Sequence, residues 1–245
     1  MTEHTDLGVP ATIRALLFDL DGVLTKTATL HAKAWKTTFD GFLDGRGAPF
    51  TLDTDYAEYV DGKPRIDGVR SFLGARGIAL PEGDPDDSPT ARTVHGLANR
   101  KNQLVLGMIR DEGVQAYEDA VEYLRAVDGA GMPRAVVSSS ANCHDVLVSA
   151  GIDGFFQTEI DGRAAAELGL AGKPAPDTFL AGAEALGVEP AQAAVLEDAL
   201  AGVAAGRAGN FGVVVGVDRA NHGDALLAHG ADLVVAELTE LLNKA

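Results

Sequence analysis

The chain has 245 residues, with 36 Asp and Glu against 20 Lys and Arg, a formal net charge of -16 and one cysteine. At this length, a composition of 46% hydrophobic residues suffices for one large core, or for a core with a smaller lobe, and excludes global disorder. The acidic excess, without a Lys/Arg cluster, argues against nucleic acid and anionic membranes as partners. One cysteine forms no intramolecular disulfide, the first residues carry no targeting pattern, and no apolar run approaches the roughly 20 residues of a membrane span. We therefore expect a cytoplasmic protein.

The first predicted strand covers residues 13–18, a short apolar run that ends in the polar turn Asp19-Leu20-Asp21-Gly22. The region that follows this turn has a helical pattern instead of a strand pattern. Apolar residues at near-helical spacing predict helices over 29–42, around 66–73 and around 94–108. A Pro-, Asp- and Ser-rich surface loop interrupts this helical region at 81–90.

From residue 114 onward, helical and strand patterns alternate, with strands predicted at 134–137, 155–160, 193–196, 211–217 and 233–235. This alternation predicts an α/β fold with a doubly wound, Rossmann-like parallel sheet. We assign residues 1–28 and 114–245 to this core and 29–113 to an inserted helical cap domain. Because the cap follows the first strand, it lies over the sheet edge where α/β proteins bind ligands, and would form a lid.

Polar side chains follow the ends of the predicted strands, and parallel strands bring these ends together. They are Asp19, Asp21, Ser138, Lys173, Glu197 and Asp198. Four crowded carboxylates require a divalent cation, and an oxygen-only set suits Mg²⁺, which also favours substrate phosphates. Lys173 and the Ser138 hydroxyl would bind the remaining phosphate oxygens. Asp19 could then attack phosphorus, with Asp21 spaced to act as general acid and base.

Each of these features also has a purely structural interpretation. An Asp-x-Asp pair after a strand is commonly a turn or helix cap, and Glu197-Asp198 could likewise cap the next helix. Ser138 to Ser140 could cap the helix that follows. It is the combination at several strand ends that favours a phosphoryl-transfer site.

The motifs DLDGVLTKT, VSSS, GKPAPD and LEDALAG resemble those of the haloacid dehalogenase (HAD) superfamily, in the same order and spacing. The similarity covers nearly the whole chain and is closest to the β-phosphoglucomutase subfamily. It includes HAKAWK, VDGKPR and NRKN in the cap, which resemble substrate-contacting segments of that subfamily.

The resemblance implies Asp19 as nucleophile and metal ligand, Asp21 as general acid/base that binds metal through its backbone carbonyl, and Asp198 as a ligand supported by Glu197. Ser138 and Lys173 match the residues that hold the reacting phosphate. The remaining positions match residues that bind the sugar or its distal phosphate. They are His31, Trp35, Gly62, Lys63, Arg65, Lys101, Ser139, Ser140 and Asn142.

Some positions depart from the family pattern without removing a catalytic group. Lys26 stands where an acid is usual, and Asp61 stands where a base is common, although Lys63 could restore that charge. Ala141 and Ala199 replace polar residues. Segments 81–90 and 161–170 are extra length.

These residues indicate a magnesium-dependent phosphosugar mutase that converts β-D-glucose 1-phosphate to glucose 6-phosphate through an aspartyl phosphate and a bisphosphate. The alternatives are a phosphatase of the same architecture that acts on a small phosphate ester, and a non-catalytic phosphosugar-binding module. A basic cap site at Arg65 and Lys101 favours the mutase, and the retained core residues argue against the binding module. We expect a small-molecule phosphosugar as partner and a monomer, with an oligomer left open.

Overall fold

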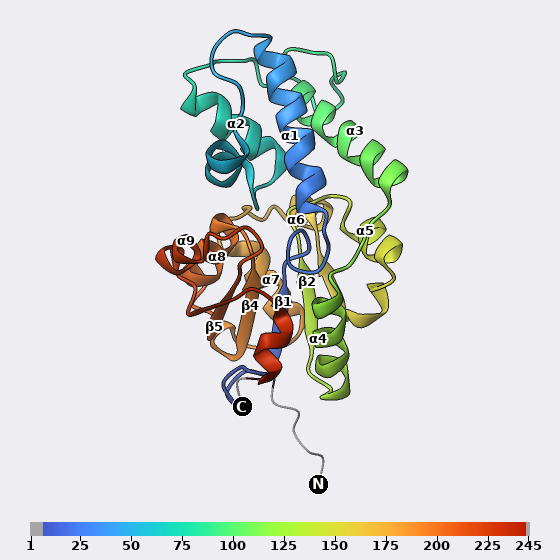
Figure 1. The fold of residues 1–245 in the computed structure, drawn as a ribbon, viewed down its shortest axis with the longest axis vertical. Helices are drawn as coiled ribbons and strands as arrows, with labels where there is room; N and C mark the ends of the chain where they lie inside the picture. The colour runs from blue at the N-terminus through green and yellow to red at the C-terminus, as the bar shows by residue number, and fades with distance from the viewer. Residues whose placement is uncertain (1–6, 244–245) are drawn as a thin grey trace.

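The computed structural model describes residues 7–243, so residues 1–6 and 244–245 of the predicted core domain lie outside the described residues. Its centre is a six-stranded sheet in the order β3-β2-β1-β4-β5-β6, with every neighbouring pair parallel (Figure 1). The strands are β1 (Ala15–Phe18), β2 (Arg134–Val137), β3 (Thr158–Ile160), β4 (Ala193–Glu197), β5 (Val213–Val217) and β6 (Leu233–Val235). The doubly wound α/β fold predicted from the alternating pattern is therefore confirmed.

The helices fall into two groups, one around the sheet and one beyond its carboxyl edge (Figure 1). The second group contains α1 (Ala28–Leu43), the π-helix η1 (Leu52–Val60), α2 (Arg65–Ala75) and α3 (Val94–Glu112). The core helices are α4 (Glu118–Gly129), α5 (Cys143–Ala150), α6 (Gly162–Leu168), α7 (Asp177–Ala185), α8 (Leu200–Ala208) and α9 (Gly223–His229). Short 3₁₀ turns complete the chain as η2 (Asp153–Phe155), η3 (Pro190–Gln192) and η4 (Leu238–Asn243).

The sheet is buried on both faces, as its continuous apolar strands require. Leu16 and Phe18 of β1 join one apolar cluster, whereas Ala15 and Leu17 join another on the opposite face. A third cluster lies wholly within residues 35–98 and includes the stacked rings of Trp35, Phe39 and Phe50, with the Phe72 ring tilted against them. This separate apolar cluster supports our proposal that residues 29–113 form a cap domain of their own, inserted between the two segments of the core.

Three segments differ from the sequence-based prediction or add to it. The strand predicted over 155–160 begins only at Thr158, because Asp153–Phe155 form a 3₁₀ turn. Residues 162–168, within one of the extra segments, form helix α6, whereas residues 81–90 remain an irregular loop as predicted. The π-helix over Leu52–Val60 was not predicted.

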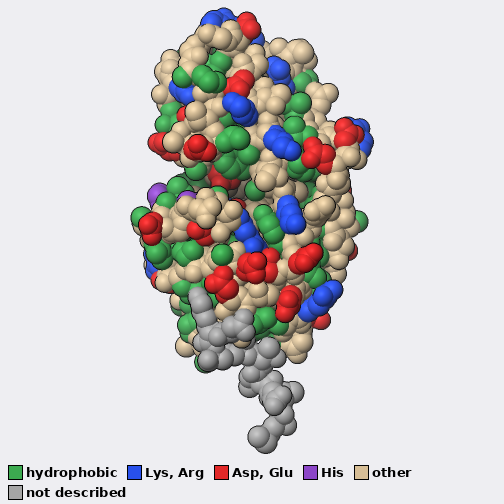
Figure 2. All heavy atoms as spheres, in the orientation of Figure 1, with side chains coloured by type: hydrophobic (Ala, Val, Ile, Leu, Met, Phe, Trp, Pro, Cys, Tyr) green, Lys and Arg blue, Asp and Glu red, His purple; other side chains and the backbone are tan. Residues whose placement is uncertain are grey.

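The surface agrees with the balance of charges in the sequence. On the face drawn in Figure 2, Lys and Arg side chains are scattered among acidic ones and form no extended basic patch. Across residues 7–243, none of the helices combines the length and the apolar character needed to cross a bilayer.

The aromatic cluster of the cap gives a first prediction. Phe72 is fully buried, and its ring centroid lies 4.0 Å from that of Phe39 and 5.2 Å from that of Phe50. Phe72→Ala leaves a cavity there and should lower the free energy of unfolding by about 3–5 kcal/mol. Denaturant unfolding followed by the fluorescence of Trp35, the one tryptophan in the chain, measures this change.

The control is Leu106→Ala, at a side chain that is 38% exposed on α3, which should change stability by less than about 1 kcal/mol. Equal effects of the two substitutions would contradict a closely packed cap core.

Candidate active site

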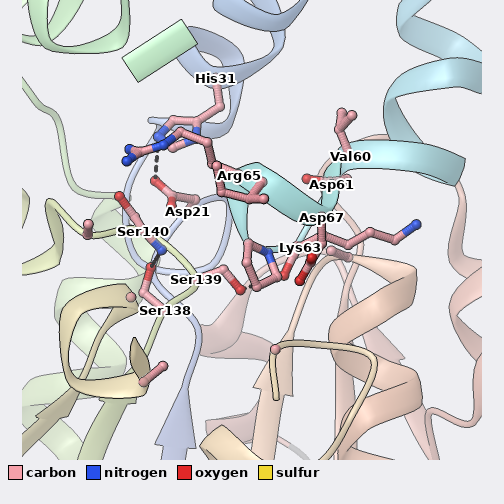
Figure 3. A pocket seen from close by; sticks show the side chains of 18 of the residues that line it. Asp21, His31, Val60, Asp61, Lys63, Arg65, Asp67, Ser138, Ser139 and Ser140 are labelled. Atoms are coloured by element: carbon pink, nitrogen blue, oxygen red, sulfur yellow. Dashed lines mark hydrogen bonds and ion pairs between the residues drawn. The ribbon is translucent and has the colours of Figure 1, made fainter. Parts of the chain in front are cut away.

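A cavity of about 510 Å³ lies between the carboxyl edge of the sheet and the cap helices (Figure 3). It opens where the strand order reverses between β1 and β4, the position at which open α/β sheets bind ligands. The cap closes onto the core through Ser139, whose hydroxyl donates a hydrogen bond of 2.7 Å to the carbonyl oxygen of Gly62. Pro64 of the cap packs directly on Gly172, where any Cβ would overlap its ring. The cap is therefore closed over the pocket in this structure.

Three buried carboxylates from the ends of two adjacent strands lie at the floor of the pocket or directly beneath it. Phe18 of β1 pairs with Leu196 of β4, and the next residue along each strand is an acid, Asp19 and Glu197. Asp198 follows, and one oxygen atom from each of the three carboxylates lies within 4.8 Å of the others. Since these residues are at most 8% exposed, water screens their mutual repulsion only weakly.

Lys173 is the cation that holds this cluster together. Its Nζ lies 2.5 Å from Asp19 Oδ1 and 2.7 Å from Glu197 Oε2, and it donates to the carbonyl oxygen of Val137. Burial alone would lower the pKa of Lys173, but the charges of Asp19 and Glu197 outweigh it and hold that pKa above its ordinary value. Lys173 is therefore charged throughout the physiological range.

One ammonium does not neutralise three carboxylates, and the pKa values reflect this. Burial, followed by the charge of Glu197, raises the pKa of Asp19 well above its usual range, against the opposing effect of Lys173. The carboxylate of Asp198 has no hydrogen-bond or ion-pair partner among residues 7–243. A buried, oxygen-only donor set with excess negative charge fits a hard divalent cation. Asp19, Glu197 and Asp198 can therefore hold such a metal.

The turn after β1 directs Asp21 away from this cluster and toward the cap. Its carboxylate accepts a hydrogen bond from Thr27 Oγ1, and His31 Nε2 of α1 lies 3.6 Å from Asp21 Oδ1. Gly22 permits this path, because it has a φ of +89° and any Cβ would overlap the carboxylate of Asp198. Asp21 thus faces the cavity from its core side, below His31 in Figure 3.

The serine run after β2 forms a wall of the cavity in which the three hydroxyls have different contacts. Ser138 is 2% exposed, and its Oγ accepts a hydrogen bond from the backbone N–H of Ser140 at 3.1 Å. Ser139 binds the cap, as described above. Ser140 Oγ accepts from the backbone N–H of Asn142, whose side chain donates in turn to Asn102 of α3.

The opposite wall comes from the cap and carries buried basic groups. Lys101 Nζ lies 2.9 Å from His31 Nδ1 and 5.0 Å from the centroid of the Trp35 ring. Burial lowers the pKa of Lys101 to about 7 and that of His31 to about 4. Arg65 also faces the cavity, and its buried Nε has no hydrogen-bond partner among the described residues. An unpaired buried donor of this kind suits an anionic ligand.

The structure brings most of the predicted site residues to this one cavity. Lys173 and Glu197 lie beneath it rather than along its wall, and Lys173 binds both Asp19 and Glu197. Lys63 borders the cavity, but its ammonium donates to the Glu58 carbonyl and the Ser71 hydroxyl within the cap. The remaining predicted residues line the cavity. They are Asp19, Asp21, His31, Trp35, Gly62, Arg65, Lys101, Ser138, Ser139, Ser140, Asn142 and Asp198.

Five polar residues that line the cavity were missed by the sequence reasoning as site residues, namely Tyr56, Asp61, Asp67, Asn102 and Thr178. Asn102 sits next to Lys101 in the NRKN segment, and that adjacency was the available signal. Tyr56 belongs to the unpredicted π-helix, so no pattern pointed to it. Asp61 drew attention only as an unusual charge in VDGKPR.

Comparisons with known proteins agree with this geometry. The chain is 55% identical to a beta-phosphoglucomutase of Mycobacterium bovis, over 96% of this chain and 94% of that protein. It is 32% identical to a beta-phosphoglucomutase of Bacillus subtilis, over 94% and 92% of the two chains. The crystal structure of a beta-phosphoglucomutase from Clostridium difficile matches with a TM-score of 0.73 and 26% identity, over 95% of this chain and 98% of that one. Residues 13–210 match the model of the haloacid dehalogenase-like hydrolases, and the chain therefore belongs to this enzyme family.

Proposed function

We propose that this chain is a magnesium-dependent phosphosugar mutase that converts β-D-glucose 1-phosphate to glucose 6-phosphate. The observation that carries the proposal is the pairing of two features in one closed cavity. Asp19 lies on its floor beside Lys173, and Arg65, whose buried Nε has no hydrogen-bond partner among the described residues, lies on its cap wall. A mutase must hold one phosphate at the reacting carboxylate and another at a distance from it. The names of the relatives support the same substrate class.

In the proposed reaction, Asp19 carries the phosphoryl group as an aspartyl phosphate. The 6-hydroxyl of the sugar attacks this phosphorus, its proton passes to Asp21, and the bond from phosphorus to the Asp19 oxygen breaks. The resulting glucose 1,6-bisphosphate reorients in the cavity. Asp19 then attacks the phosphate on C1, Asp21 returns its proton to the leaving sugar oxygen, and glucose 6-phosphate is released.

The residues around Asp19 orient the reacting phosphate and stabilise its charge. Lys173 Nζ, 2.5 Å from Asp19 Oδ1, is within reach of oxygens on a phosphate bound there. Ser138 supplies a hydroxyl at the end of the neighbouring strand β2. Donors fixed in advance in a buried site stabilise developing charge more effectively than water does.

A divalent cation, which we infer to be Mg²⁺, would be held by Asp19, Asp198 and the backbone carbonyl of Asp21, with Glu197 in support. When bound, it would neutralise the carboxylates and polarise the transferred phosphoryl group.

The cap has two roles in this proposal. Arg65 would bind the distal phosphate with its bidentate donors, and Lys101 and His31 would contact the sugar or its phosphate. The contact of Ser139 with Gly62 would keep the cavity closed during transfer and exclude water, which would otherwise hydrolyse the aspartyl phosphate. A cytoplasmic location and a monomeric state stay predictions from the sequence.

The first test separates transfer from hydrolysis. The protein is incubated with β-D-glucose 1-phosphate, Mg²⁺ and a trace of glucose 1,6-bisphosphate, while glucose 6-phosphate and free phosphate are followed in parallel. We expect glucose 6-phosphate to account for nearly all substrate consumed. Release of one phosphate per substrate would instead identify a phosphatase, and no turnover of any phosphate ester would identify a binding module.

A second test concerns the distal phosphate. Arg65→Ala removes the guanidinium from the cap wall and should lower kcat/KM for β-D-glucose 1-phosphate by about a hundredfold. Arg65→Lys should recover only part of this loss, because an ammonium lacks the bidentate geometry.

The matched control for this test is Arg70→Ala on the same helix, since Arg70 is about half exposed and pairs with Asp67 and Glu82. We expect its kcat/KM to stay within about twofold of the unmodified protein. If Arg65→Ala behaved like Arg70→Ala, the distal phosphate would have to bind elsewhere.

A further inference from the structure

A further carboxylate reaches the acid cluster from the cap, and the mechanism above does not use it. Asp61 lines the same cavity as Asp19, Asp21 and Asp198. Its position follows from a close contact between the two lobes. Gly62, with a φ of +68°, packs so tightly on Ala199 that a Cβ would lie 2.8 Å from the Ala199 Cβ. Asp61 and Asp198 are the residues that precede this contact on each side.

Few positive charges balance Asp61. Among the described residues, no Lys, Arg or His side chain forms an ion pair with the Asp61 carboxylate. Lys63, which the sequence suggested as compensation, directs its ammonium to Glu58 and Ser71 instead. Lys101 is near enough to feel the charge of Asp61, but without an ion pair Asp61 still adds negative charge to the cavity.

This charge acts on Asp198, which borders the same cavity. After burial, the charge of Asp61 is the largest influence that raises the pKa of Asp198, ahead of Glu197, Asp19 and Asp21. Asp198 is also 8% exposed and has no donor for its carboxylate among the described residues. Asp198 and Asp61 thus border one cavity from the core and from the cap, and a cation bound at Asp198 would offset negative charge from both.

This arrangement makes closure of the cap depend on the charge of the floor. Without a cation, closing the cap moves Asp61 toward Asp198 and three further acids in a poorly screened space, which costs free energy. With a divalent cation on the floor, its two positive charges offset part of this negative charge, so the same movement costs less free energy. Asp61 lies outside the group of oxygens within 4.8 Å of one another, so it acts through its charge rather than as a ligand.

We propose that Asp61 is a cap-borne carboxylate of the metal site that couples binding of a divalent cation to closure of the cap. This inference rests on the metal site of the proposed function. It adds that binding of the cation precedes full closure of the cap. Coupling is reciprocal, so the cation favours the closed cap and the closed cap strengthens binding of the cation. The enzyme would then close fully only once its metal is bound, so that the aspartyl phosphate forms in a protected site.

The test measures metal binding and cap closure without any phosphosugar. MgCl₂ is titrated into the full chain in a calorimeter, and hydrogen exchange of residues 60–66 is followed with and without Mg²⁺. In the unmodified protein, Mg²⁺ should slow exchange of this segment. Asp61→Asn should weaken Mg²⁺ binding by about fivefold or more, the lower range of typical coupling. Asp61→Asn should also slow hydrogen exchange of residues 60–66 in the absence of metal, so that adding Mg²⁺ slows this exchange by less than in the unmodified protein.

Two more variants make the result decisive. Asp61→Lys should weaken Mg²⁺ binding further than Asp61→Asn and hold the cap closed without metal. Glu82→Gln removes the same charge from the cap, but Glu82 is about half exposed, pairs with Arg70 and does not line the cavity, so the Mg²⁺ affinity should stay within about twofold. Near-ultraviolet circular dichroism shows which variants fold. If only one of the two Asp61 variants folds, that variant is enough to test the proposal.

The inference is overturned if folded Asp61→Asn or Asp61→Lys binds Mg²⁺ like the unmodified protein and keeps its metal-dependent exchange. If the unmodified protein binds no Mg²⁺, both the inference and the proposed metal site fail. Because no sugar is present, failure of the mutase assay would leave this coupling untouched, and the two outcomes are distinguishable.

Discussion

Three buried carboxylates share one ammonium in this protein, and the rest of the site depends on that imbalance. Asp19, Glu197 and Asp198 converge because β1 and β4 pair in register at the point where the strand order reverses. Lys173 compensates two of them directly and leaves Asp198 without a donor. Such a cluster is costly to bury unless a further positive charge joins it. The cost is consistent with a site built to receive a cation together with an anionic substrate, each of which makes the other easier to bind.

The cap completes this balance from the opposite side of the cavity. It contributes Arg65 and Lys101 as donors for an anion, and also Asp61, which faces the core acids. The lobes touch where backbone and small residues permit close approach, as in the contact of Gly62 with Ser139 and Ala199. The same movement that excludes water therefore also changes the electrostatics of the floor. Part of the excess of Asp and Glu over Lys and Arg in the sequence therefore comes from residues of the site itself.

Much of the fold could be predicted from the sequence, because buried parallel strands are short apolar runs that end in polar residues. The strands at Arg134–Val137 and Leu233–Val235 have the predicted bounds. The π-helix Leu52–Val60 could not be anticipated in this way, since Asp55 is buried there and held by Arg76, 21 residues away. The direction of the Lys63 side chain likewise depends on tertiary partners. The acids at the strand ends were predictable because topology alone brings them together.

The most direct test of the account is to identify the residue that carries the phosphoryl group. The protein is incubated with Mg²⁺ and glucose 1,6-bisphosphate, quenched in acid, digested and examined by mass spectrometry, with Asp19→Asn treated identically. The expected result is a single phosphate on the side chain of Asp19, absent from the variant. A phosphate on His31 or Ser138, or equal labelling of the Asp19→Asn protein, would contradict the account.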